Sequence, residues 1–442
     1  MQEININFEK SAGKVKPMHA VNNGPVYKFA SDQLITNIDS WRDAVIPYAR
    51  THDASFCSTY GGSHTVDVNA IFPDFDKDPY DPASYDFPIT DYYMKVIEAG
   101  GTKVFYRLGS KIEHEIKKYN TIPPKNFKKW AVICEHIIRH YTEGWADGFK
   151  MDMEYWEIWN EPDLDDDDSD NKRCWGGTKQ QYFELYDIAA THLKKCFPHL
   201  KIGGPALAYR LDWGEEFLSQ LKAPLDFFSW HCYSCNPRGL GEQMHKIRDM
   251  LDRHGFKDTE SILNEWNYVR SFEGEQWIYT IRNEKGLKGA SFIACAMCLG
   301  QYAPLDMLMY YDARPCSMNG MFNTDLVCDC LKGYYPFKMF NNLYTLDEAV
   351  PAECIGDNIY TCAAKGKNKK AVMLSYFNDD DSTPADKVKI HFSALDKPCT
   401  AKIYLLDETK DLEFVREEKV SGNSLDLELD VTLFCSYLIV LE

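Results

Sequence analysis

Tyr155-Trp156-Glu157-Ile158-Trp159-Asn160-Glu161-Pro162 is an apolar, β-prone stretch that carries a glutamate at its end, beside tryptophans. About a hundred residues later, Ser261-Ile262-Leu263-Asn264-Glu265-Trp266-Asn267 has the same form. Each run predicts a buried strand. A buried carboxylate is costly unless a partner or a substrate compensates for the water that it loses. The two strand ends therefore predict a pair of functional carboxyl groups, those of Glu161 and Glu265.

Short β-prone runs alternate with longer amphipathic stretches from about residue 14 to about residue 312. Eight candidate strands lie at residues 17–21, 48–52, 103–108, 155–160, 201–204, 226–231, 261–265 and 307–311. Apolar residues recur at helical spacing at residues 127–141, 179–196, 240–254 and 277–298. This alternation predicts an α/β fold, a (β/α)8 TIM barrel over residues 14–344. No glycine-rich motif such as GxGxxG favours nucleotide binding.

The last hundred residues have a different pattern of short alternating runs. Candidate strands lie at residues 359–363, 371–376, 387–392, 400–406, 424–429 and 434–441, with polar turns between them. This pattern predicts an antiparallel β-sandwich over residues 345–442. Residues 3–8 also alternate, so we assign residues 1–13 to the same accessory sandwich. No long linker is visible, which predicts that the sandwich is docked on the barrel.

The chain of 442 residues has a formal net charge of −18 and a pI near 5.2. This acidity disfavours nucleic acids and anionic membranes as main partners, because both select a basic protein face. No apolar run reaches the length of a membrane helix, and the first residues lack the basic and apolar regions of a signal peptide. We therefore expect a cytoplasmic protein that acts on a small substrate, with a homo-oligomer left open.

Fifteen cysteines, many of them in apolar runs, predict reduced thiols in the core. Cys232-Tyr233-Ser234-Cys235 has the spacing of a redox motif or half a zinc site, but no second such pair accompanies it. The run Asp165-Asp166-Asp167-Asp168 lacks the alternating ligands and central glycine of a calcium loop. We therefore predict no metal, no organic cofactor, and a solvated loop at the aspartate run.

The two glutamates fall where barrel enzymes carry out their chemistry. In a (β/α)8 barrel, functional side chains come from the C-terminal ends of the strands. Glu161 closes the fourth predicted strand and Glu265 closes the seventh, so both face one mouth. Glycoside hydrolysis needs such a pair, one carboxyl to protonate the leaving oxygen and one to attack or to activate water. A separation of about 5 Å indicates retention of configuration, whereas roughly 6.5–9.5 Å indicates inversion.

Asn160-Glu161-Pro162 after strand four, with a glutamate at the end of strand seven, resembles clan A of the glycoside hydrolases. Within that clan the chain resembles family 39, the family of β-xylosidases and α-L-iduronidases. Further segments that carry the resemblance are residues 16–25, Arg50-Thr51-His52-Asp53, Trp230-His231-Cys232-Tyr233 and Asn264-Glu265-Trp266-Asn267. The likeness covers nearly the whole chain and implies the barrel with a terminal sandwich.

The resemblance also implies roles for single residues. Glu161 is expected to be the general acid/base, and Glu265 the nucleophile. Asn160 is expected to hydrogen-bond the 2-hydroxyl of the sugar. Arg50 is expected to hold Glu265 as an anion, because a neighbouring positive charge favours the ionised carboxyl. The other expected contacts of the substrate are His52, His231 and Tyr233.

Strand eight departs from the commoner family pattern at Tyr310-Tyr311-Asp312-Ala313-Arg314-Pro315. Asp312 and Arg314 either contact the distal end of the sugar or pair with each other in a solvated loop. Trp266 is a candidate platform on which a sugar stacks, with core packing as the alternative.

The alternation of side chains along a strand predicts the faces on which Trp156 and Trp159 lie. Side chains two residues apart share a face, so Trp159 is expected on the side of Glu157, and Trp156 on the side of Ile158.

The expected function is that of an exo-acting retaining glycosidase of plant-type oligosaccharides, with β-xylosidase as the family default. An arabinosidase or a uronate-directed glycosidase, in which Arg314 binds the carboxylate, is the alternative within the family. A non-catalytic carbohydrate-binding protein is the alternative from another class. An acyl hydrolase is disfavoured, because the sequence has no G-x-S-x-G motif.

Overall fold

The computed structural model of the protein describes residues 2–30, 32–53, 65–324, 328–395 and 398–442. Eight parallel strands close into a barrel in the neighbour order β10-β11-β2-β5-β6-β7-β8-β9. They are β2 (Ala20–Asn22), β5 (Tyr48–Thr51), β6 (Lys103–Leu108), β7 (Tyr155–Ile158), β8 (Lys201–Leu207), β9 (Phe227–Ser234), β10 (Glu260–Tyr268) and β11 (Met307–Tyr310). Each candidate strand overlaps one of these, so the predicted TIM barrel is confirmed.

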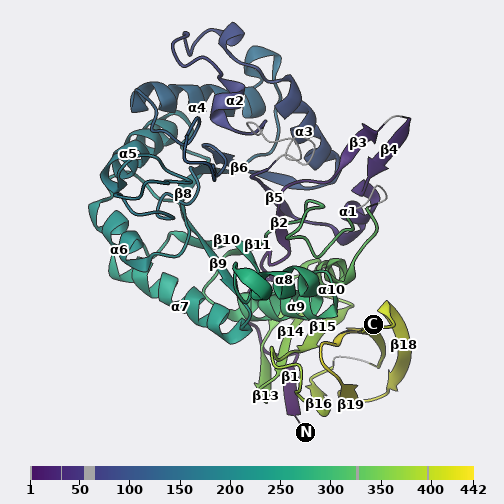
Figure 1. Cartoon of the computed structure of the whole chain (residues 1–442). Helices are drawn as coiled ribbons and strands as arrows, with labels where there is room; N and C mark the ends of the chain where they lie inside the picture. The colour runs from purple at the N-terminus through teal and green to yellow at the C-terminus, as the bar shows by residue number, and fades with distance from the viewer. Residues whose placement is uncertain (1, 31, 54–64, 325–327, 396–397) are drawn as a thin grey trace.

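Helices surround the barrel, and Figure 1 shows them as an outer ring. They are α1 (Ile38–Ala44), α2 (Val68–Ile71), α3 (Pro88–Ala99), α4 (Phe127–Thr142), α5 (Lys179–Cys196), α6 (Leu211–Gln220), α7 (Pro237–Arg253), α8 (Gly274–Glu284), α9 (Leu287–Tyr302) and α10 (Tyr335–Tyr344). Inside the barrel, Phe105, Tyr155, Phe227 and Ile262 form one apolar cluster near the starts of their strands. The lumen is therefore packed at that end, and polar side chains converge at the other.

Two predicted boundaries in this part of the chain are wrong. Residues 277–298 form not one helix but parts of α8 and α9, and Gly286 lies between them in an extended conformation. Apolar spacing continues across the break, so only the glycine marked it. Strand β10 runs on to Tyr268, which places Glu265 inside the strand rather than at its end. A hairpin of β3 (Tyr27–Ala30) and β4 (Gln33–Thr36) was not predicted.

Two further sheets pack face to face at the lower edge of the barrel in Figure 1. One contains β12 (Glu348–Val350), β14 (Ile359–Lys365), β15 (Lys370–Tyr376), β20 (Ser436–Leu441), β17 (Cys399–Leu406) and β18 (Asp411–Val420) in spatial order. The other contains β13 (Ala352–Ile355), β1 (Gln2–Asn7), β16 (Asp386–Ser393) and β19 (Ser424–Val431). Ile6, Val372, Leu427 and Ile439 lie in the core between them, as a sandwich requires. The sandwich is confirmed, although β1 and β16 pair in parallel.

Strand β18 was not predicted from the sequence. Most of its residues are exposed, and it pairs with β17 alone as an edge strand. Its sequence, DLEFVREEKV, is rich in charge, which is how proteins protect an edge from unwanted pairing. The apolar alternation that marks a half-buried strand is therefore absent.

The sandwich contacts the barrel through an ionic cluster around Asp379. Asp379 accepts hydrogen bonds from the hydroxyl of Tyr268 at 2.6 Å and from Nε of Arg270 at 2.8 Å. Nζ of Lys288, on α9, lies 3.0 Å from the same carboxylate. All three partners belong to the barrel side of the chain, so one aspartate of the β15–β16 turn connects the two parts.

The aspartate run is more ordered than predicted. Asp165 accepts two hydrogen bonds from the guanidinium of Arg173, at 3.0 and 2.7 Å, and Asp166 pairs with Arg210 at 2.5 Å. Asp166, Asp167 and Asp168 are exposed, as expected for a solvated loop, and these ion pairs hold the loop in place. None of the fourteen cysteines that the structure describes forms a disulfide. Over the same residues, no helix is both long enough and apolar enough to cross a bilayer.

Candidate active site

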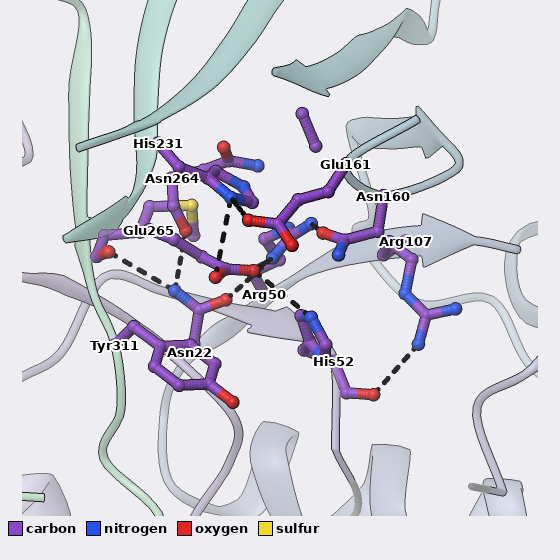
Figure 2. A network of polar contacts seen from close by, with 12 residues as sticks. Asn22, Arg50, His52, Arg107, Asn160, Glu161, His231, Asn264, Glu265 and Tyr311 are labelled. Atoms are coloured by element: carbon purple, nitrogen blue, oxygen red, sulfur yellow. Dashed lines mark hydrogen bonds and ion pairs between the residues drawn. The ribbon is translucent and has the colours of Figure 1, made fainter. Parts of the chain in front are cut away.

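Polar side chains from several barrel strands meet at the carboxyl ends of these strands (Figure 2). Strand β5 and the residue after it supply Arg50 and His52, and the end of β7 supplies Asn160 and Glu161. Strand β9 supplies His231 and Tyr233, and β10 supplies Glu265. Residues more than two hundred positions apart thus form one site.

Glu265 is surrounded by hydrogen-bond donors. Its Oε1 lies 2.7 Å from Nη1 of Arg50 and 3.2 Å from Nε2 of His52. Its Oε2 accepts from the hydroxyl of Tyr233 at 2.9 Å and lies 3.5 Å from Nδ1 of His231. Burial alone would raise the pKa of Glu265, but the charges of His231, His52 and Arg50 outweigh it and hold that pKa well below its usual range. Glu265 is therefore an oriented, buried anion.

Glu161 has a different environment. Its φ is +47°, a left-handed value that is rare for a residue with a side chain, and its N–H donates to the carbonyl of Ala206 at 3.0 Å. Oε1 lies 2.8 Å from Nδ1 of His231, and Oε2 accepts from the thiol of Cys174 at 3.6 Å. The side chain is 14% exposed, against 6% for Glu265. Glu161 is thus the carboxyl that is more open to a ligand.

The two carboxyl groups are close neighbours. One oxygen of Glu161, one oxygen of Glu265 and a ring nitrogen of His231 all lie within 4.8 Å of one another. Nδ1 of His231 lies 2.8 Å from Glu161 and 3.5 Å from Glu265, so one ring contacts both carboxyl groups. The same three atoms are close enough together to hold a metal ion. Without a metal ion, the acid–base or nucleophilic chemistry of this site depends on its two carboxyls.

Arg50 connects the site to a third carboxylate that we did not predict to be functional. Its Nε donates to Oε2 of Glu157 at 2.7 Å, and Nη2 donates to Oδ1 of Asn160 at 2.6 Å. The other oxygen of Glu157 accepts from Asn264 at 2.5 Å. Arg50 and Glu157 are both fully buried. Arg50 thereby fixes the position of Glu265 and of Asn160 together.

The sequence around this site resembles the sequences of known proteins. The sequence model of glycosyl hydrolases family 39 matches residues 65–265, a segment that includes Glu161 and ends on Glu265. A β-xylosidase from Geobacillus stearothermophilus is 33% identical over 201 residues, which cover 40% of this chain and 36% of that protein. This part of the chain, less than half of its 442 residues, is similar to glycoside hydrolase family 39. The match spans about a third of the length of that β-xylosidase.

Two solved structures share the fold along the whole chain. A glucosidase from Croceicoccus marinus has a TM-score of 0.79 and 21% identity, and the alignment covers 100% of this chain and 99% of that one. A β-xylosidase from Caulobacter crescentus has a TM-score of 0.71 and 17% identity, with the same coverage. At these identities the likeness supports the fold alone.

Arg314 and Asp312 lie at the edge of this site, where Arg314 contacts Asp53 next to His52. Nη2 of Arg314 is 3.2 Å from Asp312 and 3.3 Å from Asp53, and the hydroxyl of Tyr311 donates to Asp53 at 3.0 Å. Asp312 is fully buried and the Arg314 side chain is 13% exposed. The expected pairing of the two is present, but the loop is buried rather than solvated. A contact between these residues and a sugar stays a prediction.

The predicted role of Trp266 as a stacking platform is not supported by its position. Its ring is fully buried and packs against Phe292 of α9 and against Tyr310. Glu265 faces the barrel mouth, so its neighbour in the strand points outward, between the sheet and the helix layer. Trp266 is a core residue.

Trp159 also differs from expectation. Glu157 points into the barrel, yet Trp159 packs outside against Trp130 and Trp175, and its Nε1 donates to the carbonyl of Cys174 at 2.8 Å. Strand β7 ends at Ile158, and Trp159 has a φ of +74°. The alternation of the strand therefore no longer applies at this position.

Sequence reasoning left out several residues of this site. Asn22 accepts from Arg50 at 3.0 Å and donates to the carbonyl of Asn264 at 2.7 Å. Arg107 donates to the carbonyl of His52 at 2.9 Å and pairs with Asp67 at 2.8 Å. A usable signal was a charged or amide side chain inside an otherwise apolar strand, as at Glu157.

Proposed function

We propose that the protein is an exo-acting retaining glycoside hydrolase with β-xylosidase-like specificity, and that Glu161 and Glu265 carry the reaction. The observation behind this proposal is the close pair of carboxyls at the barrel mouth, with ligand atoms within 4.8 Å. Retaining enzymes use two carboxyls about 5 Å apart, because one of them must reach the anomeric carbon directly. The β-xylosidase from Geobacillus stearothermophilus supports the choice of sugar.

In the proposed first step, protonated Glu161 gives its proton to the glycosidic oxygen while an oxygen of Glu265 attacks the anomeric carbon. The bond to the leaving group breaks, and a covalent bond to Glu265 forms. In the second step Glu161, now a carboxylate, takes a proton from water as the water attacks the same carbon. The sugar leaves with its original configuration, and both glutamates return to their starting states.

The surroundings of the two acids fit these unequal roles. Arg50, His52 and Tyr233 stabilise the anionic form of Glu265, which is the form that a nucleophile needs. Glu161 is more exposed, and among the described residues no arginine forms an ion pair with it. Asn160 uses its carbonyl oxygen to accept from Arg50, which orients its NH₂ group for the 2-hydroxyl of the sugar.

The alternatives are separable by chemistry. A uronate-directed enzyme would need a free cation, and Arg314 already contacts two carboxylates. An arabinosidase and a xylosidase differ in which sugar ring the pocket binds and in where the hydroxyls of that ring lie. A non-catalytic sugar-binding protein would not turn over any glycoside.

The test is release of nitrophenol from a panel of aryl glycosides: β-D-xyloside, α-L-arabinofuranoside, α-L-arabinopyranoside, β-D-glucoside, β-D-galactoside and β-D-glucuronide. We expect the wild type to cleave the xyloside, and Glu265→Ala to lose this activity. Azide should then rescue Glu265→Ala and yield a glycosyl azide of inverted configuration, because the small anion takes the place of the missing nucleophile. Glu161→Ala with azide should give the retained azide, since its nucleophile is intact.

Glu260→Gln is the matched control, because Glu260 lies in the same strand at the opposite end of the barrel and pairs with Lys201. It should keep its activity. Full activity of Glu265→Ala would contradict the proposed nucleophile. Cleavage of another sugar would overturn the xylosidase assignment, and silence of the wild type across the panel would favour the binding protein.

A further inference from the structure

A second cluster of potential ligand atoms lies outside the barrel, where α4 and α5 pack side by side. Nε2 of His192 is 2.7 Å from Oε2 of Glu135 and 3.8 Å from Sγ of Cys196. The three ligand atoms all lie within 4.8 Å of one another. This cluster is separate from the barrel mouth, and the proposed reaction does not use it.

The backbone holds these side chains in place. His192 and Cys196 are four residues apart on α5, so they lie on one face, one turn above the other. Helix α5 begins with a capping box between Thr178 and Gln181, which fixes its first turn. Glu135 comes from the middle of α4. Two rigid helices therefore present three donors to one point.

We propose that Glu135, His192 and Cys196 bind one Zn²⁺ ion, with water as the fourth ligand. A carboxylate, an imidazole and a thiolate are the three donor types that zinc uses in proteins. One carboxylate and one thiolate also neutralise the charge of the ion. On binding, the thiol proton passes to solvent, and the proton between Nε2 of His192 and Glu135 leaves Nε2. The neutral imidazole then carries its proton on Nδ1, and Nε2 binds the metal.

The distances are close to those of a tetrahedral zinc site. Zn–N and Zn–S bonds of about 2.0 and 2.3 Å place the nitrogen and the sulfur roughly 3.5 Å apart. Nε2 of His192 and Sγ of Cys196 are 3.8 Å apart. Zn–N and Zn–O bonds of about 2.0–2.2 Å place nitrogen and oxygen roughly 3.3 Å apart. The pair of His192 and Glu135, at 2.7 Å, must therefore open slightly when the ion replaces their shared proton.

The carboxylate already has the outer support that metal ligands need. Nε of Arg139 donates to Oε1 of Glu135 at 2.8 Å, which leaves Oε2 for the metal. Arg139 also pairs with Glu143 and lies over the ring of Phe197. The charge of Arg139 is thus shared between two carboxylates. Arg139 can therefore keep its hydrogen bond to Glu135 when the metal ion binds.

An ion has a route to this cluster. The His192 side chain is 31% exposed and lines a surface groove of about 890 Å³ between α4 and α5. Thr191 and Lys195 line the same groove. The groove therefore brings solvent to His192, and a zinc ion at this cluster would join α4 to α5 on the outer wall of the barrel.

The test is zinc binding by the full chain after removal of metal with a chelator, measured by calorimetry with zinc chloride. We expect one tight equivalent, and an affinity at least about tenfold weaker in His192→Ala and in Cys196→Ser. Cobalt(II) in place of zinc should give a thiolate-to-cobalt charge-transfer absorption that is absent in Cys196→Ser. Zinc should also raise the midpoint of thermal unfolding of the wild type more than that of either variant.

Two controls separate this site from others. Cys354→Ser removes an exposed thiol from the sandwich and should leave the cobalt absorption unchanged. Glu161→Gln disables the ligand cluster at the barrel mouth and should also keep the tight equivalent. Circular dichroism of each variant shows that it is folded. Loss of binding in Glu161→Gln, unaltered binding in Cys196→Ser, or no tight equivalent in the wild type would each overturn the proposal.

Discussion

His52 shows how a single residue is tuned by its surroundings. It lies with Nε2 3.2 Å from Glu265 and Nδ1 3.5 Å from Asp53, and its side chain is 5% exposed. Burial would lower the pKa of His52, but Asp53 and Glu265 raise it from 6.5 to about 9. At neutral pH the residue is therefore a buried cation that compensates two carboxylates.

This charge predicts a pH dependence of stability. The folded pKa lies above the unfolded value, so protonation of His52 stabilises the fold fully below about pH 6.5, and the stabilisation is lost as the pH rises through about 9. The shift corresponds to roughly 3 kcal/mol. In urea unfolding, His52→Gln should be less stable than the wild type near pH 6, and the difference should shrink as the pH approaches about 10.

His391→Gln is the control for this measurement, because His391 is a half-exposed residue that pairs with Asp426 on the sandwich. It should show little pH-dependent difference from the wild type. A stability difference between the wild type and His52→Gln that stays constant with pH would contradict the assigned charge of His52.

Part of the residue-scale site follows from the sequence, and part does not. Glu161 and Glu265 end apolar runs, so each carries a local signal. Glu157 has the same kind of signal, but its meaning depends on Arg50 and Asn264, which are 107 residues away on either side. Only closure of the barrel brings these three together. Trp266 was misassigned because adjacent strand positions point to opposite faces.

At the scale of elements, β5, β7 and β10 are joined by one buried ionic network. Arg50 of β5 contacts Glu157 of β7 and Glu265 of β10. Glu157→Gln removes one of two anions that compensate Arg50. Loss of one partner from a buried ion pair costs roughly 3 kcal/mol or more. We therefore expect Glu157→Gln to lower both the free energy of unfolding in urea and the turnover of the aryl glycoside.

Glu154→Gln is the matched control, because Glu154 immediately precedes β7 and pairs with Lys201 in a partly exposed position. Exposed pairs contribute at most about 1 kcal/mol. Equal stability and activity of the two variants would contradict a positioning role for Glu157.

Elements with a strong apolar period could be predicted well, and α5 matches its predicted bounds, residues 179–196. The failures have physical causes. The predicted helix at residues 277–298 is divided at Gly286, and apolar spacing does not reveal such a break. Strand β18 is an exposed edge whose charged residues carry no alternation.

For the whole molecule, Asp379 is one of several contacts between sandwich and barrel, beside Asp381, which pairs with Lys288 at 2.7 Å. Tyr268, Arg270 and Lys288 all direct their polar groups to Asp379. Asp379→Ala leaves two cations without this partner, so we expect a loss of about 1–3 kcal/mol in the free energy of unfolding. The neighbouring Asp380→Ala removes an exposed carboxylate that caps only Ser382, and it should be nearly neutral.

Urea unfolding, followed by tryptophan fluorescence, measures the free energy of unfolding of Asp379→Ala and of Asp380→Ala. Tryptophans occur in the barrel part of the sequence and are absent after residue 277, so this signal reports the barrel. If Asp379→Ala and Asp380→Ala unfold at the same urea concentration, the cluster does not couple the two parts.

The parallel pairing of β1 with β16 has a consequence for synthesis on the ribosome. Gln2 and Asp386, joined by a hydrogen bond, are 384 residues apart in the chain. Ile4 and Ile6 of β1 therefore stay without their native neighbours until residues 352–393 have emerged. The barrel strands can associate earlier, whereas the sandwich is completed last. Contacts between such distant parts of a chain form slowly, and the unpaired β1 is exposed to chaperones and to aggregation in the meantime.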